Sequence, residues 1–302
     1  MNNDKKAFIL ACFAVVFWST VATAFKISLS FVTPIQLLAF ASLFSSLVLF
    51  LVIILQNKLK SILSVSLKDL IISFGIGFFN PFLYYFVLFK AYSLLPAQEA
   101  LALNYTWAIV LTILTSVVQK KKVRFVAYLA LFVSFFGVLI IISKGSIVAL
   151  RPSNTLGAIL AISSSLIWGF SWIMNLMSKL DVEIRLFFNF IFGSIFSFIA
   201  LLINQGFVIP NLLATISIFY VATFEMGVTF VLWNKALKNA SNPAKINNLI
   251  YASPLISVLF INLFLKEKIL GYTLLGLLLI ILGILMQNTP FAQIKESKDS
   301  VN

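Results

Sequence analysis

Long apolar runs separated by short polar turns make up most of the chain. Each run is close to the roughly 20 residues that an α-helix needs to cross the hydrocarbon core of a bilayer. The runs lack the alternation of apolar and polar positions that membrane β-strands show, so helices are the expected element. The pattern predicts an all-α integral membrane protein with ten transmembrane helices, at approximately 7–27, 34–55, 70–91, 97–118, 124–143, 157–178, 184–204, 216–237, 243–265 and 269–288.

The second half of the chain repeats the plan of the first. Tyr105 corresponds to Tyr251, and Gly137 to Gly283, at one spacing of 146 residues (105 to 251, 137 to 283). Only residues 144–156 have the Gly, Pro, Ser and Asn content of a boundary. A unit of five helices is odd, so the second copy must enter the membrane from the opposite side, as in many secondary transporters. We predict two inverted five-helix repeats, at 1–143 and 157–288, with a linker at 144–156 and a cytoplasmic tail at 289–302.

Composition and charge agree with a membrane protein. Hydrophobic residues make up 61% of the chain, charged residues 10%, and the mean hydropathy is +1.07. Alternate loops divide the Lys and Arg residues as 16 and 6, which together account for all 22. Because cytoplasmic loops carry the excess of positive charge, both termini are predicted to be cytoplasmic. The net charge of +13 is then a topology signal and not a nucleic-acid-binding surface.

The first helix resembles a signal peptide, with Lys5 and Lys6 before an apolar run and Ala22-Thr23-Ala24 as a cleavage-like site. We predict that this helix is retained, because a second long apolar run follows it. The motif around Trp18 also has a counterpart around Trp168 in the second half.

The residue inventory restricts the chemistry. The chain has no histidine, and its one cysteine, Cys12, cannot form an intrachain disulfide. No GxxxxGK[ST] motif is present. We therefore predict no cofactor, no metal site and no enzymatic activity, and transport that runs on a gradient or by exchange.

Only two acidic side chains lie at membrane depth, Glu99 and Glu225. Burying a carboxylate in hydrocarbon is costly, so an intramembrane acid is a functional candidate, and burial favours the neutral form that proton coupling requires. Both residues are proton-coupling candidates. Glu99 lies near the end of its helix, so the alternative for it is solvation or pairing with Lys90.

Amide and aromatic residues recur on the same helix faces. Asn104 and Trp107 are spaced i, i+3, and Asn247 and Tyr251 are spaced i, i+4. Such groups suit an amphipathic organic substrate, although packing or interface anchoring is the alternative for each aromatic residue. The residues predicted to line a substrate cavity are Trp18, Tyr84, Asn104, Trp107, Trp168, Asn175, Asn247 and Tyr251.

Two prolines are predicted to bend helices. Pro81 lies within the helix at 70–91, and Pro254 lies within the helix at 243–265. A bend at Pro81 is expected either beside the substrate or as a packing kink without a ligand.

These motifs resemble the drug/metabolite transporter superfamily, specifically its ten-helix EamA-type members. The likeness covers nearly the whole chain and is most specific at Phe17–Thr20, at Glu99 with Asn104-Tyr105-Thr106-Trp107, at Trp233-Asn234 and from Tyr251 to Lys268. The first two stretches look most like the aromatic amino-acid exporter branch. Ala108 stands where that branch has proline, which predicts that only the second of the paired helices, with Pro254, keeps its bend.

The resemblance implies a carrier in the bacterial inner membrane, with two halves around a central cavity, that exports amino acids or related metabolites. Its expected partners are a small-molecule substrate and the lipid bilayer, and the sequence leaves a homo-oligomer open. An alternative is an importer or exchanger of a larger anionic, nucleotide-type metabolite, in which Lys26, Lys90 and Lys235 would face the cavity. A membrane scaffold is the non-transport alternative, but a scaffold has no need of Glu225 at membrane depth.

Overall fold

The computed structural model describes residues 3–118, 125–146, 152–175, 177–203, 207 and 209–287, and every regular element within them is helical. The first half contains α1 (Asn3–Leu29), α2 (Pro34–Leu55), α3 (Leu59–Leu63), α4 (Leu67–Gly77), the π-helical turn η1 (Phe78–Leu83), α5 (Tyr84–Leu94), α6 (Ala97–Asn104), α7 (Trp107–Val118) and α8 (Phe125–Ile142). The second half contains α9 (Thr155–Asn175), α10 (Val182–Ile203), α11 (Leu212–Phe224), α12 (Val228–Asn239), α13 (Pro243–Asn247), the 3₁₀ turn η2 (Asn248–Ala252), α14 (Ser253–Leu265) and α15 (Gly271–Gln287).

Polar residues before the first turn define where several helices begin. The side chain of Thr33 accepts a hydrogen bond from the amide of Gln36 at the start of α2, and Pro34 occupies the first helical position. At the start of α11, Asn211 accepts a 2.9 Å bond from the amide of Ala214. The first amides of a helix have no partner within the helix, so these side chains satisfy them, and proline has no amide to satisfy.

Helical elements cover the predicted segments where the structure describes them, with outer ends that differ by a few residues, but not every segment is one continuous helix. Seven helical spans within the described residues are long and apolar enough to cross a membrane, and three of them join consecutive elements, at Leu67–Leu94, Leu212–Asn239 and Asn248–Leu265. The helices α8 and α15 contain shorter apolar segments. The predicted segment at 97–118 is divided between α6 and α7. The chain is therefore an all-α membrane protein. Residues 147–151 of the predicted linker and 288–302, which include the predicted tail, lie outside the described residues.

Four of the predicted helices are interrupted near their middles. The interruptions are Asn80 within η1, Tyr105–Thr106 between α6 and α7, Glu225–Gly227 between α11 and α12, and η2 between α13 and α14. Asn80 has φ −148° and ψ 112°, which are not helical values, and it precedes Pro81. The positions are paired along the chain, because Asn80 and Met226 are 146 residues apart (80 to 226), the spacing of Tyr105 and Tyr251.

Ala108 does not preserve a continuous helix, so the prediction that only the second of the paired helices is interrupted is wrong. The Thr106 hydroxyl donates to the carbonyl of Leu103 at 2.7 Å and contacts the Ser165 hydroxyl of α9 at 2.9 Å. Side-chain bonds of this kind compete with the helical backbone bonds and fasten the turn to its neighbour. Pro254, in turn, lies in the first turn of α14 and not in the middle of a continuous helix.

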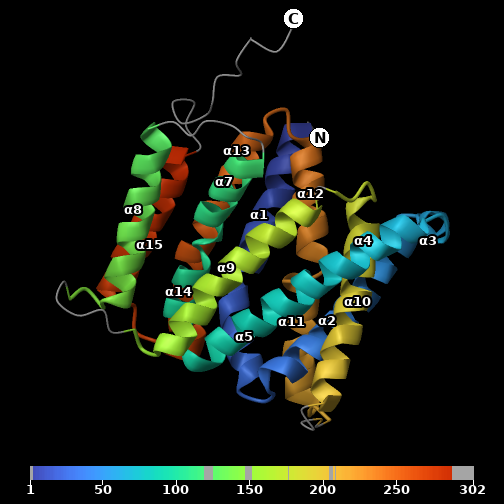
Figure 1. Cartoon of the computed structure of the whole chain (residues 1–302), viewed down its shortest axis with the longest axis horizontal. Helices are drawn as coiled ribbons and strands as arrows, with labels where there is room; N and C mark the ends of the chain where they lie inside the picture. The colour runs from blue at the N-terminus through green and yellow to red at the C-terminus, as the bar shows by residue number, and fades with distance from the viewer. Residues whose placement is uncertain are drawn as a thin grey trace, which may run out of the picture.

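Helices of the two halves alternate through the molecule (Figure 1). The most extensive pairings each join the first half to the second, namely α8 with α15, α2 with α10, α5 with α9, and α1 with α12. The α8–α15 pair forms one edge in Figure 1, and α2, α4, α10 and α11 gather at the other edge. Gly137 and Gly276 allow α8 and α15 to approach closely, because a Cβ on either residue would meet the carbonyl oxygen of the other.

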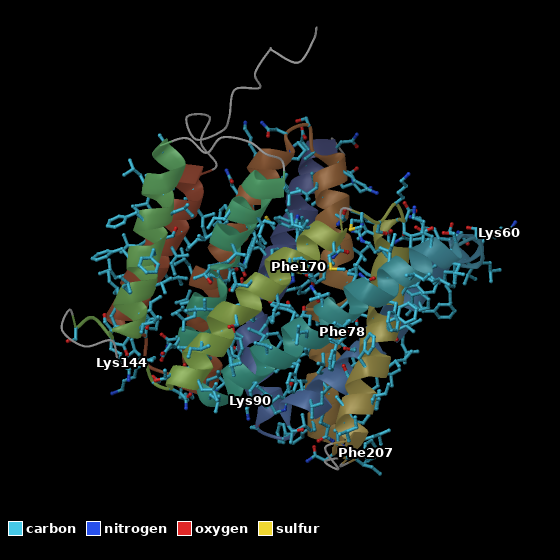
Figure 2. All side chains as sticks on the ribbon, in the orientation of Figure 1. Lys60, Phe78, Lys90, Lys144, Phe170 and Phe207 are labelled. Atoms are coloured by element: carbon cyan, nitrogen blue, oxygen red, sulfur yellow. The ribbon has the colours of Figure 1, made fainter. Side chains whose placement is uncertain are left out.

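The outer surface is apolar, as a bilayer requires. Exposed aromatic side chains include Phe8 and Phe13 on α1, and Phe132 and Phe135 on α8. Figure 2 places Lys60 at the right-hand edge of the molecule, and Lys90 and Lys144 along its lower edge.

Candidate substrate cavity

A cavity of about 500 Å³ lies between helices of both halves. This volume is typical of a site for a small organic molecule. The wall is mostly apolar and aromatic, and all five tryptophans of the chain lie on it, namely Trp18, Trp107, Trp168, Trp172 and Trp233. Its polar members are Tyr84, Tyr92, Asn104, Tyr105, Arg185, Glu225, Asn234 and Tyr251.

Three of the four helix interruptions contribute residues to this wall. Tyr105 lies between α6 and α7, Glu225 between α11 and α12, and Tyr251 in η2. An interrupted helix leaves backbone groups without helical partners, and in a membrane such groups must be satisfied by protein or by a water-filled cavity. At the Glu225 interruption, the Thr229 hydroxyl satisfies the carbonyl of Phe224.

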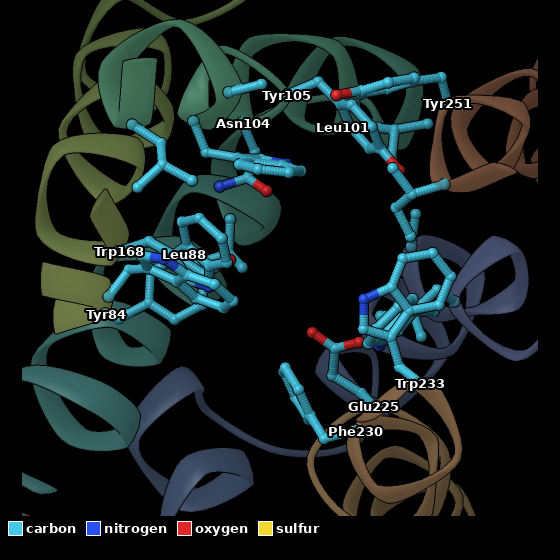
Figure 3. Close-up of a pocket in the computed structure, with 18 of the residues that line it drawn as sticks. Tyr84, Leu88, Leu101, Asn104, Tyr105, Trp168, Glu225, Phe230, Trp233 and Tyr251 are labelled. Atoms are coloured by element: carbon cyan, nitrogen blue, oxygen red, sulfur yellow. The ribbon is translucent and has the colours of Figure 1, made fainter. Parts of the chain in front are cut away.

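Glu225 extends its carboxylate into the cavity from this interruption (Figure 3). The hydroxyl of Tyr85, which is buried, donates to Glu225 Oε1 at 3.0 Å. No Lys or Arg lies within ion-pair distance of Glu225 in the part of the chain that the structure describes. The carboxylate therefore faces the cavity with a hydroxyl partner and, among the described residues, without an ion-pair partner.

The wall across the open space from Glu225 includes Tyr84, Asn104 and Trp168 (Figure 3). The amide nitrogen of Asn104 donates to the Ser164 hydroxyl at 2.9 Å. The Ser165 hydroxyl donates to the Asn104 carbonyl at 2.8 Å. These two bonds join the end of α6 to α9, so the interrupted helix is held in place by small hydroxyl residues on its neighbour.

Aromatic rings form two further surfaces. On one side, the Trp168 ring lies 4.5 Å from Trp107 and 5.4 Å from Trp172. On the other side, the Trp18 ring lies 5.5 Å from Trp233 and 5.4 Å from Phe230. Ring separations of this size are typical of aromatic pairs that stabilise one another.

A family model for the EamA-like transporter family matches the chain twice, over residues 5–143 and 155–289. The chain belongs to the EamA-like transporter family. It is 24% identical over 290 residues to the uncharacterized transporter YoaV of Bacillus subtilis, covering 92% of this chain and 95% of that protein. It is also 28% identical over 206 residues to an uncharacterized transporter of Archaeoglobus fulgidus, covering 64% of this chain and 71% of that protein.

One solved crystal structure has the same fold, with a TM-score of 0.68 at 18% identity, and the match covers 93% of this chain and 96% of that one. The family assignment makes the protein a membrane transporter and not an enzyme. Among the described residues, no group of three or more Cys, Asp or Glu side chains could hold a metal ion.

The structure brings most of the predicted cavity residues of this EamA-family transporter together. Those that line the cavity are Trp18, Tyr84, Asn104, Trp107, Trp168, Tyr251 and Glu225. Asn175 lines a smaller adjoining space, and the side chain of Asn247 lies outside the described part of the chain. Pro81 packs against Gly193 of α10, at a position where a Cβ would collide with the proline ring.

Glu99 lies elsewhere. It is not on the cavity wall, and its carboxylate accepts a 3.2 Å bond from the amide of Ser153 near the start of α9. Lys26, Lys90 and Lys235 are also absent from the wall. Lys26 donates to two backbone carbonyls at the end of α5, and Lys90 and Lys235 are exposed.

A set of contacts that we call the Glu267 clamp joins the two halves a turn before Leu101 of the cavity wall, and it is made by Glu267 and Gln98 with the backbone of 97–98 and 268–270. Glu267 Oε1 accepts the amide of Ala97 at 2.9 Å, and Oε2 accepts the amide of Gln98 at 3.4 Å. The Gln98 side chain donates to the Lys268 carbonyl at 2.8 Å and accepts the Leu270 amide at 3.5 Å. The clamp thus joins the start of α6 in the first half to the α14–α15 turn in the second.

An aromatic layer lies beside the clamp. The Phe25 ring packs edge-on against Phe89 and Tyr92, with ring centroids 4.8 and 5.3 Å away. Lys26 Nζ donates to the carbonyls of Tyr92 and Leu95 at 3.0 and 2.9 Å. The residues of this layer are buried, with no more than 2% of each exposed, namely Phe25, Phe89, Tyr92 and Leu95.

Sequence reasoning did not find Arg185 as a cavity residue or Gln98 and Glu267 as a pair. Arg185 is spaced i, i+4 from Asn189 on α10, which is a signal that both side chains share a helix face. Gln98 and Glu267 are far apart in the chain, so only the folded arrangement pairs them.

Proposed function

We propose that this EamA-family transporter is a secondary carrier that exports a small amphipathic organic solute by alternating access between two inverted five-helix repeats. The double match of the family model, the recurrence of the interruptions at one spacing, and the pairing of each half with the other support the repeat. In carriers of this design, one repeat rocks against the other around a site near the middle of the membrane.

The observation that carries the proposal is the cavity itself, with the Glu225 carboxylate facing tryptophan-rich walls at interrupted helices. Apolar walls with a few placed polar groups bind organic molecules and not inorganic ions. The cavity has room for a solute of the size of an amino acid or a related metabolite.

The Glu267 clamp supports a closed gate at one end. In the proposed topology, with both termini in the cytoplasm, the α14–α15 turn and the start of α6 are on the outer side. The clamp and the aromatic layer next to it then close the cavity toward the outside. Opening of this gate releases the exported solute.

Glu225 is the proposed proton-coupling residue. Its carboxylate is reached from the cavity and is held by Tyr85. Protonation would remove a buried charge, and the neutral form is the one that crosses between conformations at lower cost.

The test is flux in vesicles that contain the purified protein, loaded with a mixture of labelled amino acids and aromatic acids, under an imposed pH gradient. We expect Glu225→Gln to abolish flux driven by the gradient and to retain exchange at equal pH. Glu99→Gln is the matched control, since its amide oxygen can still accept the Ser153 amide, and it should keep coupling. Absence of flux by the wild type for every solute refutes export, and gradient-driven flux by Glu225→Gln refutes coupling through Glu225.

A larger anionic substrate is not favoured. That function would place Lys26, Lys90 and Lys235 on the cavity wall, but all three are elsewhere, and the cation of the wall is Arg185.

A further inference from the structure

A small chamber of about 120 Å³ adjoins the main cavity. The two spaces share five lining residues, so the chamber is a side branch of the cavity. Those residues are Trp168, Trp172, Arg185, Phe230 and Asn234. The chamber is also lined by four polar residues that the main cavity lacks, Asn80, Ser171, Asn175 and Asn189.

Arg185 is the cation of this chamber, and its hydrogen bonding is incomplete. Arg185 Nη1 donates to the carbonyl of Asn175 at 3.3 Å, which caps the end of α9. Its Nε lies buried and has no hydrogen-bond partner. A guanidinium carries five N–H donors in a fixed planar fork, so the cap leaves most of them available.

The neighbouring acids do not neutralise Arg185. Asp181 and Glu183 lie within ion-pair distance of Lys58, at 2.7 and 3.5 Å. In the part of the chain that the structure describes, no carboxylate lies within ion-pair distance of Arg185. A largely buried cation without a counter-charge is costly for the fold, and an incoming anion would remove that cost.

Asn189 adds a second incomplete group one helical turn along α10. It is only 2% exposed, and its Oδ1 has no hydrogen-bond partner. The backbone of Asn189 is held in position because α10 packs closely on Gly77, where a Cβ would meet the Asn189 carbonyl. Two unsatisfied polar groups at i, i+4 thus line one chamber, and unsatisfied buried groups of this kind are rare in folded proteins.

We infer that Arg185 and Asn189 form a carboxylate subsite, which takes the anionic end of an organic acid while its apolar body lies among the tryptophans of the main cavity. The fork of Arg185 matches the two oxygens of a carboxylate. Asn189 Oδ1 accepts an N–H or O–H donor next to that carboxylate. This inference rests on the proposed function, because it names the class of solute that the cavity carries.

Tryptophan fluorescence measures the binding directly, since all five tryptophans of the chain line the cavity. The probes are 3-phenylpropionate and its uncharged amide, which share one apolar body. We expect the wild type to bind the carboxylate at least about tenfold more tightly than the amide, because hydrogen bonds to a charged group are the strong ones.

Arg185→Gln should abolish this preference, with carboxylate affinity falling about tenfold to hundredfold and amide affinity unchanged. Arg185→Lys keeps the charge and a donor for the α9 cap but loses the fork, so an intermediate preference is expected. Unchanged amide binding in both variants shows that the cavity is intact. Lys179→Gln, which removes an exposed cation of the α9–α10 connection, is the matched control and should retain the full preference.

Equal binding of the two probes by the wild type, or a preference that survives in Arg185→Gln, overturns the subsite. Failure of the proposed function has a different signature, which is the absence of flux by the wild type in vesicles while the carboxylate still binds in an Arg185-dependent manner.

Discussion

Replacing Glu267 with alanine tests whether the clamp is a gate. The substitution removes the acceptor for two amides at the start of α6, those of Ala97 and Gln98. It leaves the two bonds of the Gln98 side chain to the α14–α15 turn in place. The perturbation therefore weakens the joint between the halves without removing it.

The size of the effect follows from the bonds that are lost. A helix cap is worth about 1 kcal/mol, within a range of roughly 0.5–2, and the charge of Glu267 near the helix start adds about 0.3–1 kcal/mol. If the closed state loses about 1–2 kcal/mol of stabilisation, the ratio of closed to open molecules falls by roughly 5-fold to 30-fold.

The assay is labelling with a membrane-impermeant thiol reagent applied from the outer side. Cys12 is first replaced by serine, and Leu101→Cys, on the cavity wall near the clamp, supplies the target. We expect Glu267→Ala to increase the labelling rate by roughly 5-fold to 30-fold. Lys268→Ala is the control, because Gln98 binds the backbone carbonyl of Lys268 and not its side chain.

Unchanged labelling in Glu267→Ala, together with a lower melting temperature, would refute the reasoning. Glu267 would then stabilise α6 without controlling access to the cavity.

Two further predictions concern the joints between the halves. The hydrogen bond between Lys58 and Asp181 lowers the pKa of Asp181 below 3.8 and raises that of Lys58 above 10.5. The contribution of this ion pair to folding stability is lost only as the pH falls through the lowered pKa of Asp181 or rises through the raised pKa of Lys58. Lys58→Gln should therefore change flux by no more than about fivefold and leave its profile between about pH 5.5 and 8 unchanged, and an altered profile would contradict this. Gly137→Ala should lower the melting temperature of the purified protein, because its Cβ meets the Gly276 carbonyl and overpacking costs about 1–3 kcal/mol. Gly271→Ala has nothing within 4 Å and should melt like the wild type, so equal melting of both variants would rule out this account of the α8–α15 contact.

The helical segments could be predicted because hydropathy is a local property of the chain. A run of apolar residues long enough to cross a bilayer must be helical there, whatever it packs against. The interruptions were harder to predict. Asn80-Pro81 marks one of them, but the interruption at Tyr105–Thr106 has no proline and depends on hydroxyl groups of α9.

The two acids at membrane depth could not be distinguished from the sequence alone. Glu99 and Glu225 satisfy the same local criterion, because each is a carboxylate within an apolar stretch. Their surroundings differ, since Glu99 accepts the Ser153 amide away from the cavity, whereas Glu225 faces the cavity beside Tyr85. Which neighbouring helix a given helix face packs against cannot be predicted from a single sequence.

The sequence by itself determined the helical membrane class and the resemblance to EamA-type transporters, because these follow from local hydropathy and short motifs. It also marked Trp18, Asn104, Trp168 and Tyr251 as cavity candidates. Only the tertiary structure decided which polar groups share the cavity, which acid lies outside it, and how Gln98 meets Glu267 across the two halves. The physical reason is that a polar group in a membrane must find its partner on a neighbouring helix, and the partner is set by helix packing and not by position in the chain.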